Sequence, residues 1–217
     1  MTDFRKARAR MVDRQIAWRG VSDDRVLRAM RAVPREAFVP ESLRFFAYDD
    51  APLPIGEGQT ISQPYVVALM IEAAALRPTE RALEVGTGSG YAAAVMAEIA
   101  GRVFTIDRLS GLADTARRRL AELGYANVEV RTGDGTLGLP EAAPFDVIIA
   151  AAAGPEVPAA WKEQLATGGR IVMPVGGIDH QELVRLTRRD DGGFDMESLG
   201  DVRFVPLVGT QGWRDTR

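Results

Sequence analysis

The sequence has no cysteine, one histidine (His180) and only two lysines, Lys6 and Lys162. The lack of cysteine excludes disulfides, thiolate nucleophiles and sulfur-ligated metals, and fits a reducing compartment. No stretch reaches the ~18 apolar residues of a membrane span, and no apolar core follows the basic residues at the N-terminus. We therefore expect a cytoplasmic protein, and we assign His180 to a surface turn.

The composition fits one α/β domain with a small appendage, since 46% of the 217 residues are apolar and 26% are charged. The charge is uneven. Residues 1–35 hold ten of the 27 basic and four of the 30 acidic residues, which gives +6 there and −9 in the remainder. The acidic body would repel a phosphate backbone, so we interpret the basic segment as a solvated helix and expect no nucleic-acid partner.

Two parts follow one another along the chain. Residues 1–61 are predicted to form a helical arm and an active-site loop, and residues 62–217 the main domain. The arm is expected to hold two helices, 3–19 ending at Gly20, and 22–33 with Ser22 as N-cap, followed by an irregular stretch to Ile61.

From Pro64 onward, apolar strands alternate with amphipathic helices, which predicts a parallel sheet with crossover helices. Antiparallel strands are expected to close the sheet, two of them joined at 190–193 and a last one in "DVRFVPLVG", residues 201–209. The other expected elements are helix 64–76, strand 81–86, helix 89–100, strand 102–106, helix 110–123, strand 127–131, strand 145–150, helix 156–166 and strand 169–175.

A glycine-rich turn, "EVGTGSGY", joins the first of these strands to a helix, and it brings Gly86, Gly88 and Gly90 close to a ligand. A dinucleotide fingerprint requires G-x-G-x-x-G, but Tyr91 stands where its third glycine belongs. A nicotinamide oxidoreductase is therefore disfavoured.

Acidic residues mark three successive strand ends. Glu84 lies two residues before the first glycine and could face the cationic amino-acid end of S-adenosylmethionine. Asp107 follows the second strand, where it could accept hydrogen bonds from ribose hydroxyls, and Asp134 follows the third, within reach of adenine. This set predicts S-adenosylmethionine as the cofactor, on a Rossmann-like methyltransferase fold with a mostly parallel, doubly wound sheet.

The sequence also limits the classes of molecule that could accept the methyl group. Enzymes that methylate base nitrogens usually carry an Asn/Asp-Pro-Pro-aromatic tetrapeptide after the fourth strand, where this chain has alanines. Metal-dependent catechol chemistry needs a lysine base, and neither lysine lies near these motifs. A carboxylate acceptor is already an anion at neutral pH, with a pKa of about 4, and needs orientation rather than a base or a metal.

The run "GEGQTIS", residues 56–62, is polar and rich in glycine, and it directly precedes a helix, so it could close over a ligand. In a purely structural interpretation, Ser62 caps that helix and Pro64 occupies its first turn.

Nearly the whole sequence resembles the bacterial form of the protein-L-isoaspartate O-methyltransferase family. The resemblance rests on "RGVSDDRVLRAMRAVPREAFVP", "AYDDAPLPIGEGQTIS", "LEVGTGSGY", "TGDGTLG", "PFDVIIAAAA", "GGRIVMPVG" and "VRFVPL". The "GQTIS" and "VPRE.FVP" segments are the specific ones, whereas many methyltransferases share the glycine motif.

The resemblance implies roles for individual residues. Ser62 corresponds to the active-site serine, in contact with the substrate carboxylate or the methyl donor. The cofactor is expected to contact Gln59, Thr60, Ile61, Ser62, Glu84, Gly86, Gly88, Gly90, Asp107, Asp134 and Gly135. The family's sheet has its last strands in altered order. Some members carry histidines just after the serine, where this chain has Tyr65 and Val67.

The implied reaction transfers a methyl group from S-adenosylmethionine to the free carboxylate of isoaspartyl residues in damaged proteins, and repair proceeds through a succinimide. We expect a monomer without a metal or a membrane partner. Two alternatives remain from the residues alone, a carboxyl methyltransferase for a peptide natural product or small acid, and a cofactor-binding protein without catalysis.

Overall fold

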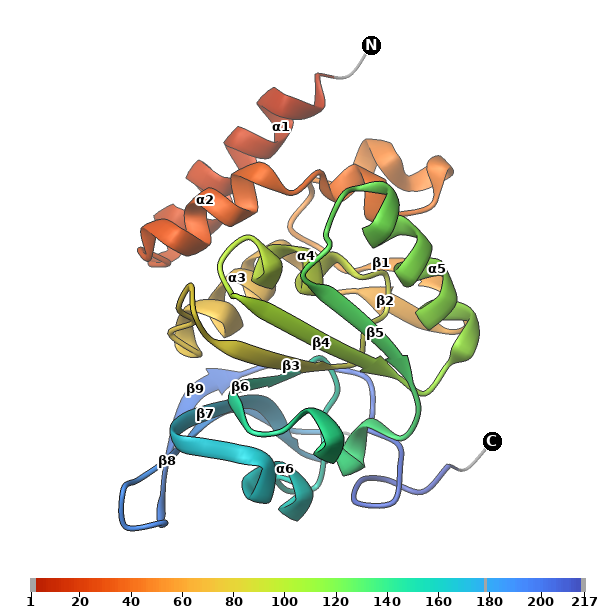
Figure 1. Ribbon diagram of the computed structural model, residues 1–217. Coiled ribbons are helices and arrows are strands. Elements are labelled where there is room, and N and C mark those ends of the chain that lie inside the picture. Colours follow the sequence, from red (N-terminus) through yellow and green to blue (C-terminus); the bar gives the residue numbers. More distant parts are fainter. Residues whose placement is uncertain (1–2, 178, 216–217) are drawn as a thin grey trace.

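A seven-stranded sheet lies between two layers of helices in the computed structural model, which describes residues 3–177 and 179–215 (Figure 1). The strand order is β5-β4-β3-β6-β7-β8-β9, parallel from β5 to β7 and antiparallel from β7 to β9. This confirms the predicted fold class. The strands are β3 (Arg81–Val85), β4 (Arg102–Asp107), β5 (Val128–Thr132), β6 (Phe145–Ala150), β7 (Leu165–Gly176), β8 (Gln181–Arg188) and β9 (Phe194–Asp201).

The helices of the main domain agree with the predicted positions but are shorter at their ends. They are α3 (Pro64–Ala73), α4 (Tyr91–Ala97), α5 (Ser110–Glu122) and α6 (Ala159–Gln164). Short 3-10 turns, Gly135–Leu137 and Pro140–Ala142, follow β5. Helix ends fray, so differences of a few residues carry little meaning.

Alternating side chains of the parallel strands bury both faces of the sheet, as a parallel sheet requires. In β6, for example, Val147 and Ile149 join the core under α3 and α4, whereas Ile148 and Ala150 join the second core, which contains Trp161 of α6. The sheet is therefore fixed from both sides, and the loops at its strand ends start from rigid positions.

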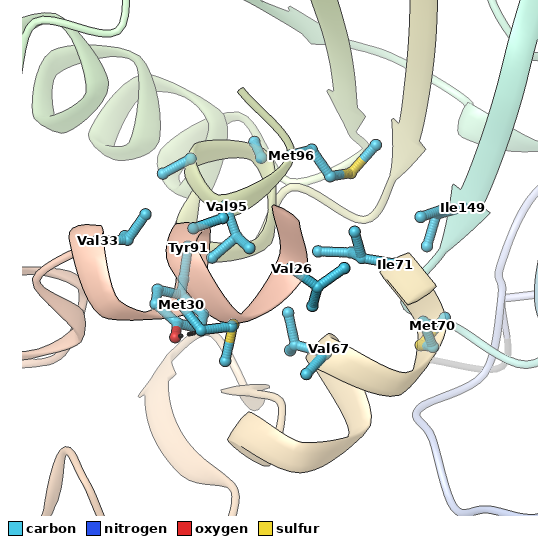
Figure 2. Close-up of a cluster of buried hydrophobic side chains, with 14 of the residues drawn as sticks. Val26, Met30, Val33, Val67, Met70, Ile71, Tyr91, Val95, Met96 and Ile149 are labelled. Atoms are coloured by element: carbon cyan, nitrogen blue, oxygen red, sulfur yellow. Dashed lines mark hydrogen bonds between the residues drawn. The ribbon is translucent and has the colours of Figure 1, made fainter. Parts of the chain in front are cut away.

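The N-terminal arm packs against the first of these cores. It holds α1 (Phe4–Met11), α2 (Asp24–Ala32) and 3-10 turns at Arg35–Phe38 and Glu41–Phe46; Val12–Ile16 forms a π-helical turn and Ala17–Arg19 a 3-10 turn. Figure 2 shows Val26 and Met30 of α2 among side chains of α3, α4 and β6. The arm thus shares a continuous hydrophobic core with the sheet.

The helix caps of the arm differ in part from the prediction. Gly20 ends the first helix in the left-handed conformation, at φ +102°, as predicted. The second helix begins one residue later than expected, because the Asp23 carboxylate, rather than the Ser22 side chain, accepts the Arg25 backbone N–H at 2.8 Å. Both residues are good N-caps, and only the local geometry selects between them.

The stretch before Ile61 is not wholly irregular. Residues Leu53–Gly56 (β1) and Gln59–Ile61 (β2) form an antiparallel hairpin. Glu57 and Gly58 both have positive φ, the conformation that a two-residue hairpin turn of type I′ requires. The sequence analysis predicts an irregular stretch here with a loop that could close over a ligand, so the hairpin was not predicted.

The predicted last strand at 201–209 is wrong. Strand β9 ends at Asp201, and the following residues form only isolated bridges, between Ala153 and Pro206 and between Val208 and Trp213. Pro206 has no N–H to donate to a ladder. His180 is exposed in the turn between β7 and β8, as predicted. Within the described ranges, no helix combines the length and apolar character needed to cross a membrane.

Candidate active site

A cavity of about 1020 Å³ opens at the carboxyl ends of β3, β4 and β6. In an open α/β sheet, this edge is the place where ligands bind, next to the point where the strand order reverses. That point is β3 here, with β4 on one side and β6 on the other. The strand-end residues that line the cavity are Val85, Gly86, Gly88, Ile106, Asp107, Arg108, Leu109, Gly135, Ala151 and Ala152.

The glycine turn forms the floor of this cavity. Gly86 has φ +93° and Gly88 has φ +50°, backbone angles that residues with a side chain rarely adopt. Gly90 has a different function in the fold. It does not line this cavity, and a Cβ there would lie 3.3 Å from Ala116 and Leu120, so its lack of a side chain lets α4 approach α5. Its contact with a cofactor stays a prediction.

Asp107, at the end of β4, joins the glycine turn to the next loop. One carboxylate oxygen accepts the Gly88 N–H at 2.8 Å and the other accepts the Leu109 N–H at 3.0 Å. The side chain is 7% exposed and lines the large cavity. Each oxygen retains a lone pair, so the carboxylate can accept further hydrogen bonds from hydroxyl groups.

Glu84 lies deeper, beneath the glycine turn, and is 1% exposed. Its carboxyl group accepts a hydrogen bond from the Thr105 hydroxyl at 2.5 Å, and the Thr105 hydroxyl lies 2.7 Å from that of Thr87. Burial raises the pKa of Glu84 to about 8, with a further contribution from the charge of Asp107. A buried acid of this kind can accommodate a cationic group, which would return it to the ionised form.

A smaller cavity of about 30 Å³ adjoins the large one, with Thr60, Gly86, Gly88 and Ala151 common to both. It is large enough for a water-sized group. Its polar lining comes from two separate parts of the chain, the end of the hairpin and the glycine turn. The residues with polar side chains are Thr60, Ser62, Glu84, Thr87, Ser89 and Tyr91.

The hairpin extends over both cavities. Gln59 and Thr60 line the large one, and Thr60, Ile61 and Ser62 line the small one. Ser62 does not cap the following helix, because the N-cap of α3 is Gln63 and carries no side-chain hydrogen bond; Pro64 occupies the first turn as predicted. The structural interpretation of Ser62 as a cap is therefore wrong, which leaves its hydroxyl group for the site.

Asp134 is not among the residues that line the large cavity. One of its oxygens accepts the backbone N–H and the hydroxyl of Thr136, at 2.9 and 2.6 Å, and the other accepts the Thr210 N–H at 2.7 Å. Partial burial acts to raise the pKa of Asp134, but these hydrogen bonds hold it below its usual value. Gly135, next in sequence, does line the cavity. The adenine contact of Asp134 stays a prediction.

The sequence reading missed the C-terminal segment 203–208 as a wall of the site. The Gln181 side chain holds this segment, donating to the Phe204 carbonyl at 3.2 Å and accepting the Phe204 N–H at 2.7 Å. Trp213 donates from its indole N–H to the Ala153 carbonyl at 2.9 Å and also lines the cavity. The "VRFVPL" motif was visible, but its β-like pattern predicted a strand.

The site fits S-adenosylmethionine better than a dinucleotide. The cavity is of the size that ligand pockets commonly have, and apolar walls from Ile106 and Leu109 flank the Asp107 carboxylate. The Asp107 carboxylate can accept hydrogen bonds from ribose hydroxyls, and the buried Glu84 carboxyl group would ionise beside a cation but not beside an anionic pyrophosphate. Within the ranges described, the one group of three possible metal ligands is His180, Glu182 and Asp201, all exposed.

Comparison with known proteins identifies a family of methyltransferases, in agreement with the assignment of S-adenosylmethionine to the site. The model of the protein-L-isoaspartate(D-aspartate) O-methyltransferase family matches residues 6–212. A protein-L-isoaspartate O-methyltransferase of Rhodopseudomonas palustris is 60% identical over 205 residues, which cover 94% of each chain. One of Marinobacter nauticus is 57% identical over 216 residues, 98% of this chain and 96% of that protein.

Solved structures agree in fold. One protein-L-isoaspartate O-methyltransferase superposes with a TM-score of 0.81 at 31% identity, covering 96% of this chain and 67% of the other. A structure from Plasmodium falciparum, described as an enzyme of the same kind in complex with S-adenosyl-L-homocysteine, has a TM-score of 0.80 at 26% identity. It covers 93% of this chain and 98% of its own.

Proposed function

The chain belongs to the protein-L-isoaspartate(D-aspartate) O-methyltransferase family, and we propose on this basis how its site carries out that reaction. The enzyme methylates the free carboxylate of isoaspartyl residues in proteins and peptides, with S-adenosylmethionine as cofactor. The observation that carries the proposal is the junction of two cavities at the glycine turn, a large one for the cofactor and a small polar one beside Ser62.

The large cavity offers matching groups for each part of the cofactor. Gly86 and Gly88 let the backbone approach it closely, and Asp107 accepts hydrogen bonds from the ribose hydroxyls. Gly135 leaves room beside the adenine, and buried Glu84, which lines the adjoining small cavity, balances the positive charge of the amino-acid end. The cofactor, when bound, supplies an electrophilic methyl group on a sulfonium.

The hairpin residues complete the enclosure. Gln59, Thr60 and Ile61 cover the cofactor from the side opposite the sheet, and Ser62 orients the substrate carboxylate through its hydroxyl group. A carboxylate needs no deprotonation at neutral pH, so these residues position the reacting groups and exclude water rather than transfer protons. Because no proton has to be removed from the substrate, the candidate catalytic serine needs no adjacent histidine as a base.

Methylation prepares the damaged residue for repair. The carboxylate becomes a methyl ester, whose methoxide leaves far more readily than an oxide. The neighbouring backbone nitrogen then attacks the ester carbonyl, expels methanol and closes a succinimide. Hydrolysis of this ring returns part of the material to ordinary aspartyl linkage, without further action of the enzyme.

We also propose that the enzyme acts in the cytoplasm as a monomer. The absence of cysteine fits a reducing compartment, and the net charge of −3 disfavours nucleic acid as a partner. The division into an arm of residues 1–61 and a domain of 62–217 belongs to the same proposal. Its support is that the arm carries the hairpin to the edge of the site.

The chemistry of the product tests the proposal. An isoaspartyl peptide is incubated with S-adenosylmethionine labelled in its methyl group, and the label is then followed under mild base. We expect the label to be released as methanol, because a methyl ester is hydrolysed by mild base.

A second test concerns the candidate catalytic residue. Ser62→Ala should lower kcat by about ten- to a hundredfold while the Kd for S-adenosylhomocysteine stays within threefold. A label that survives base, or an unchanged kcat, would contradict the assignment.

A further inference from the structure

A fully buried arginine, Arg35, joins the N-terminal arm to the active-site hairpin. It lies at the start of the 3-10 turn that follows α2 and is 0% exposed. Its Nε donates to the Ala47 carbonyl at 2.8 Å, and its Nη2 donates to the Ser62 carbonyl at 2.9 Å. One side chain therefore fixes the distance between the arm and Ser62.

The same guanidinium also contacts the helix behind the glycine turn. Its central carbon lies 4.8 Å from the ring centroid of Tyr91, the first residue of α4. Tyr91 is itself buried, and its hydroxyl lies 3.6 Å from the Met30 sulfur (Figure 2). Arg35 thus lies between the segment that carries Ser62 and the helix that follows the cofactor-binding glycines.

Core stability alone does not account for this residue. Across residues 3–177 and 179–215, no carboxylate forms an ion pair with Arg35, and its Nη1 is buried without a hydrogen-bond partner. Burial lowers the pKa of Arg35 because its charge has lost the surrounding water. An apolar side chain of similar volume would fill this space without that penalty.

Arg170 provides a contrast within the same chain. It also anchors two backbone carbonyls, those of Ala74 and Ala75, both at 2.8 Å. Its guanidinium is, however, neutralised by the Glu80 carboxylate, with two contacts of 2.9 Å. Arg170 has the arrangement expected of a structural arginine; neither arginine lines a cavity, but only Arg35 donates to the backbone of a residue that does, Ser62.

We propose that Arg35 is a positioning residue for the methyl transfer, acting through the carbonyl of Ser62 to hold the serine hydroxyl toward the small cavity. The proposal rests on the role of Ser62 given above. Since the reaction depends on orientation, a displacement of Ser62 by about 1 Å can lower the rate on the order of a hundredfold. A lysine at position 35 would keep the charge but could not form both bonds in the fixed geometry of a guanidinium.

The test compares Arg35→Lys with the control Arg170→Lys. We measure kcat and KM for an isoaspartyl peptide, the Kd for S-adenosylhomocysteine, and hydrogen exchange over residues 59–63. For Arg35→Lys we expect kcat to fall at least tenfold, Kd to stay within threefold, and exchange to rise in this segment. For Arg170→Lys we expect a lower melting temperature with kcat within twofold. A normal kcat for Arg35→Lys, or equal losses in both variants, would overturn the proposal.

A double-mutant cycle with Ser62→Ala asks whether Arg35 acts through the serine. If it does, Arg35→Lys lowers kcat much less in the Ser62→Ala background than in the unaltered chain. Independent, multiplicative losses would contradict this route. Arg35→Gln serves as a second variant, and if neither variant folds, Arg35 is a stability residue and the proposal is wrong.

The unaltered chain separates this inference from the proposed function. If it methylates the peptide while Arg35→Lys is unaffected, only the role of Arg35 fails. If the unaltered chain does not methylate the peptide, the function fails. Hydrogen exchange over residues 59–63 does not depend on activity. Its comparison between Arg35→Lys and the unaltered chain therefore still shows whether Arg35 holds Ser62.

Discussion

At the scale of single residues, Glu84 makes the clearest electrostatic contribution to the site. Its carboxyl group is buried against Thr105, and its pKa of about 8 exceeds the ordinary value of 4.5. Between these two values the folded protein retains a proton that the unfolded chain releases. The free energy of unfolding therefore falls as pH rises from 4.5 to 8, by on the order of 5 kcal/mol at most.

This pH dependence can be measured by denaturant unfolding at pH 5 and pH 8. Glu84→Gln has no proton to lose, so it should show a flatter dependence and should gain stability relative to the unaltered chain at pH 8. The difference between the two chains removes the contribution of other titrating groups. Parallel pH profiles would show that Glu84 is not held protonated in the fold.

Other residues show what the sequence could and could not indicate. The positions of Gly86, Asp107 and Asp134 at strand ends were predictable, because hydrophobic periodicity places the strands. The hydrogen bonds of each side chain were not, since Asp134 accepts from nearby Thr136 and also from Thr210, which is distant in sequence. Arg35 belongs to the specific "VPRE.FVP" segment, but the sequence did not indicate that this arginine, unlike the others of the basic segment, is buried.

At the scale of elements, the C-terminal segment 203–208 is the least predictable part of the site. Its alternating apolar residues are typical of a strand, yet β9 ends at Asp201 and the Gln181 side chain replaces strand pairing at Phe204. The hairpin of β1 and β2 was missed for a different reason, since its polar, glycine-rich sequence was interpreted as a loop that could close over a ligand. The C-terminal segment depends on contacts distant in sequence, which periodicity does not report, whereas the hairpin depends on a local turn at Glu57 and Gly58.

Removing the Gln181 side chain should loosen this segment. In Gln181→Ala we expect faster hydrogen exchange over residues 203–208 and a Kd for S-adenosylhomocysteine about three- to tenfold higher, since one wall of the cavity becomes mobile and two hydrogen bonds are lost. Thr187→Ala, on the same strand β8, is the control. Unchanged exchange over the segment would show that backbone bridges alone hold it.

At the scale of the whole molecule, the arm, the sheet and the C-terminal segment meet at one edge of the sheet. The parallel strands bring Gly86 and Asp107 there, the arm adds Ser62 through the hairpin, and the C-terminal residues close the remaining side. The alternation of strands and helices in the sequence predicts the fold class and the edge of the sheet at which the site lies. The sequence pattern does not predict the shape of the cavity, because that shape depends on how three distant segments pack together.

The most direct test of the account uses two synthetic peptides that differ only in whether one residue is isoaspartate or aspartate. Each is incubated with S-adenosylmethionine labelled in its methyl group, and kcat/KM is measured for both. The isoaspartyl linkage displaces the carboxylate by about one methylene, so a site built on orientation should favour that peptide by at least about a hundredfold. Equal kcat/KM values for the two peptides would contradict the account.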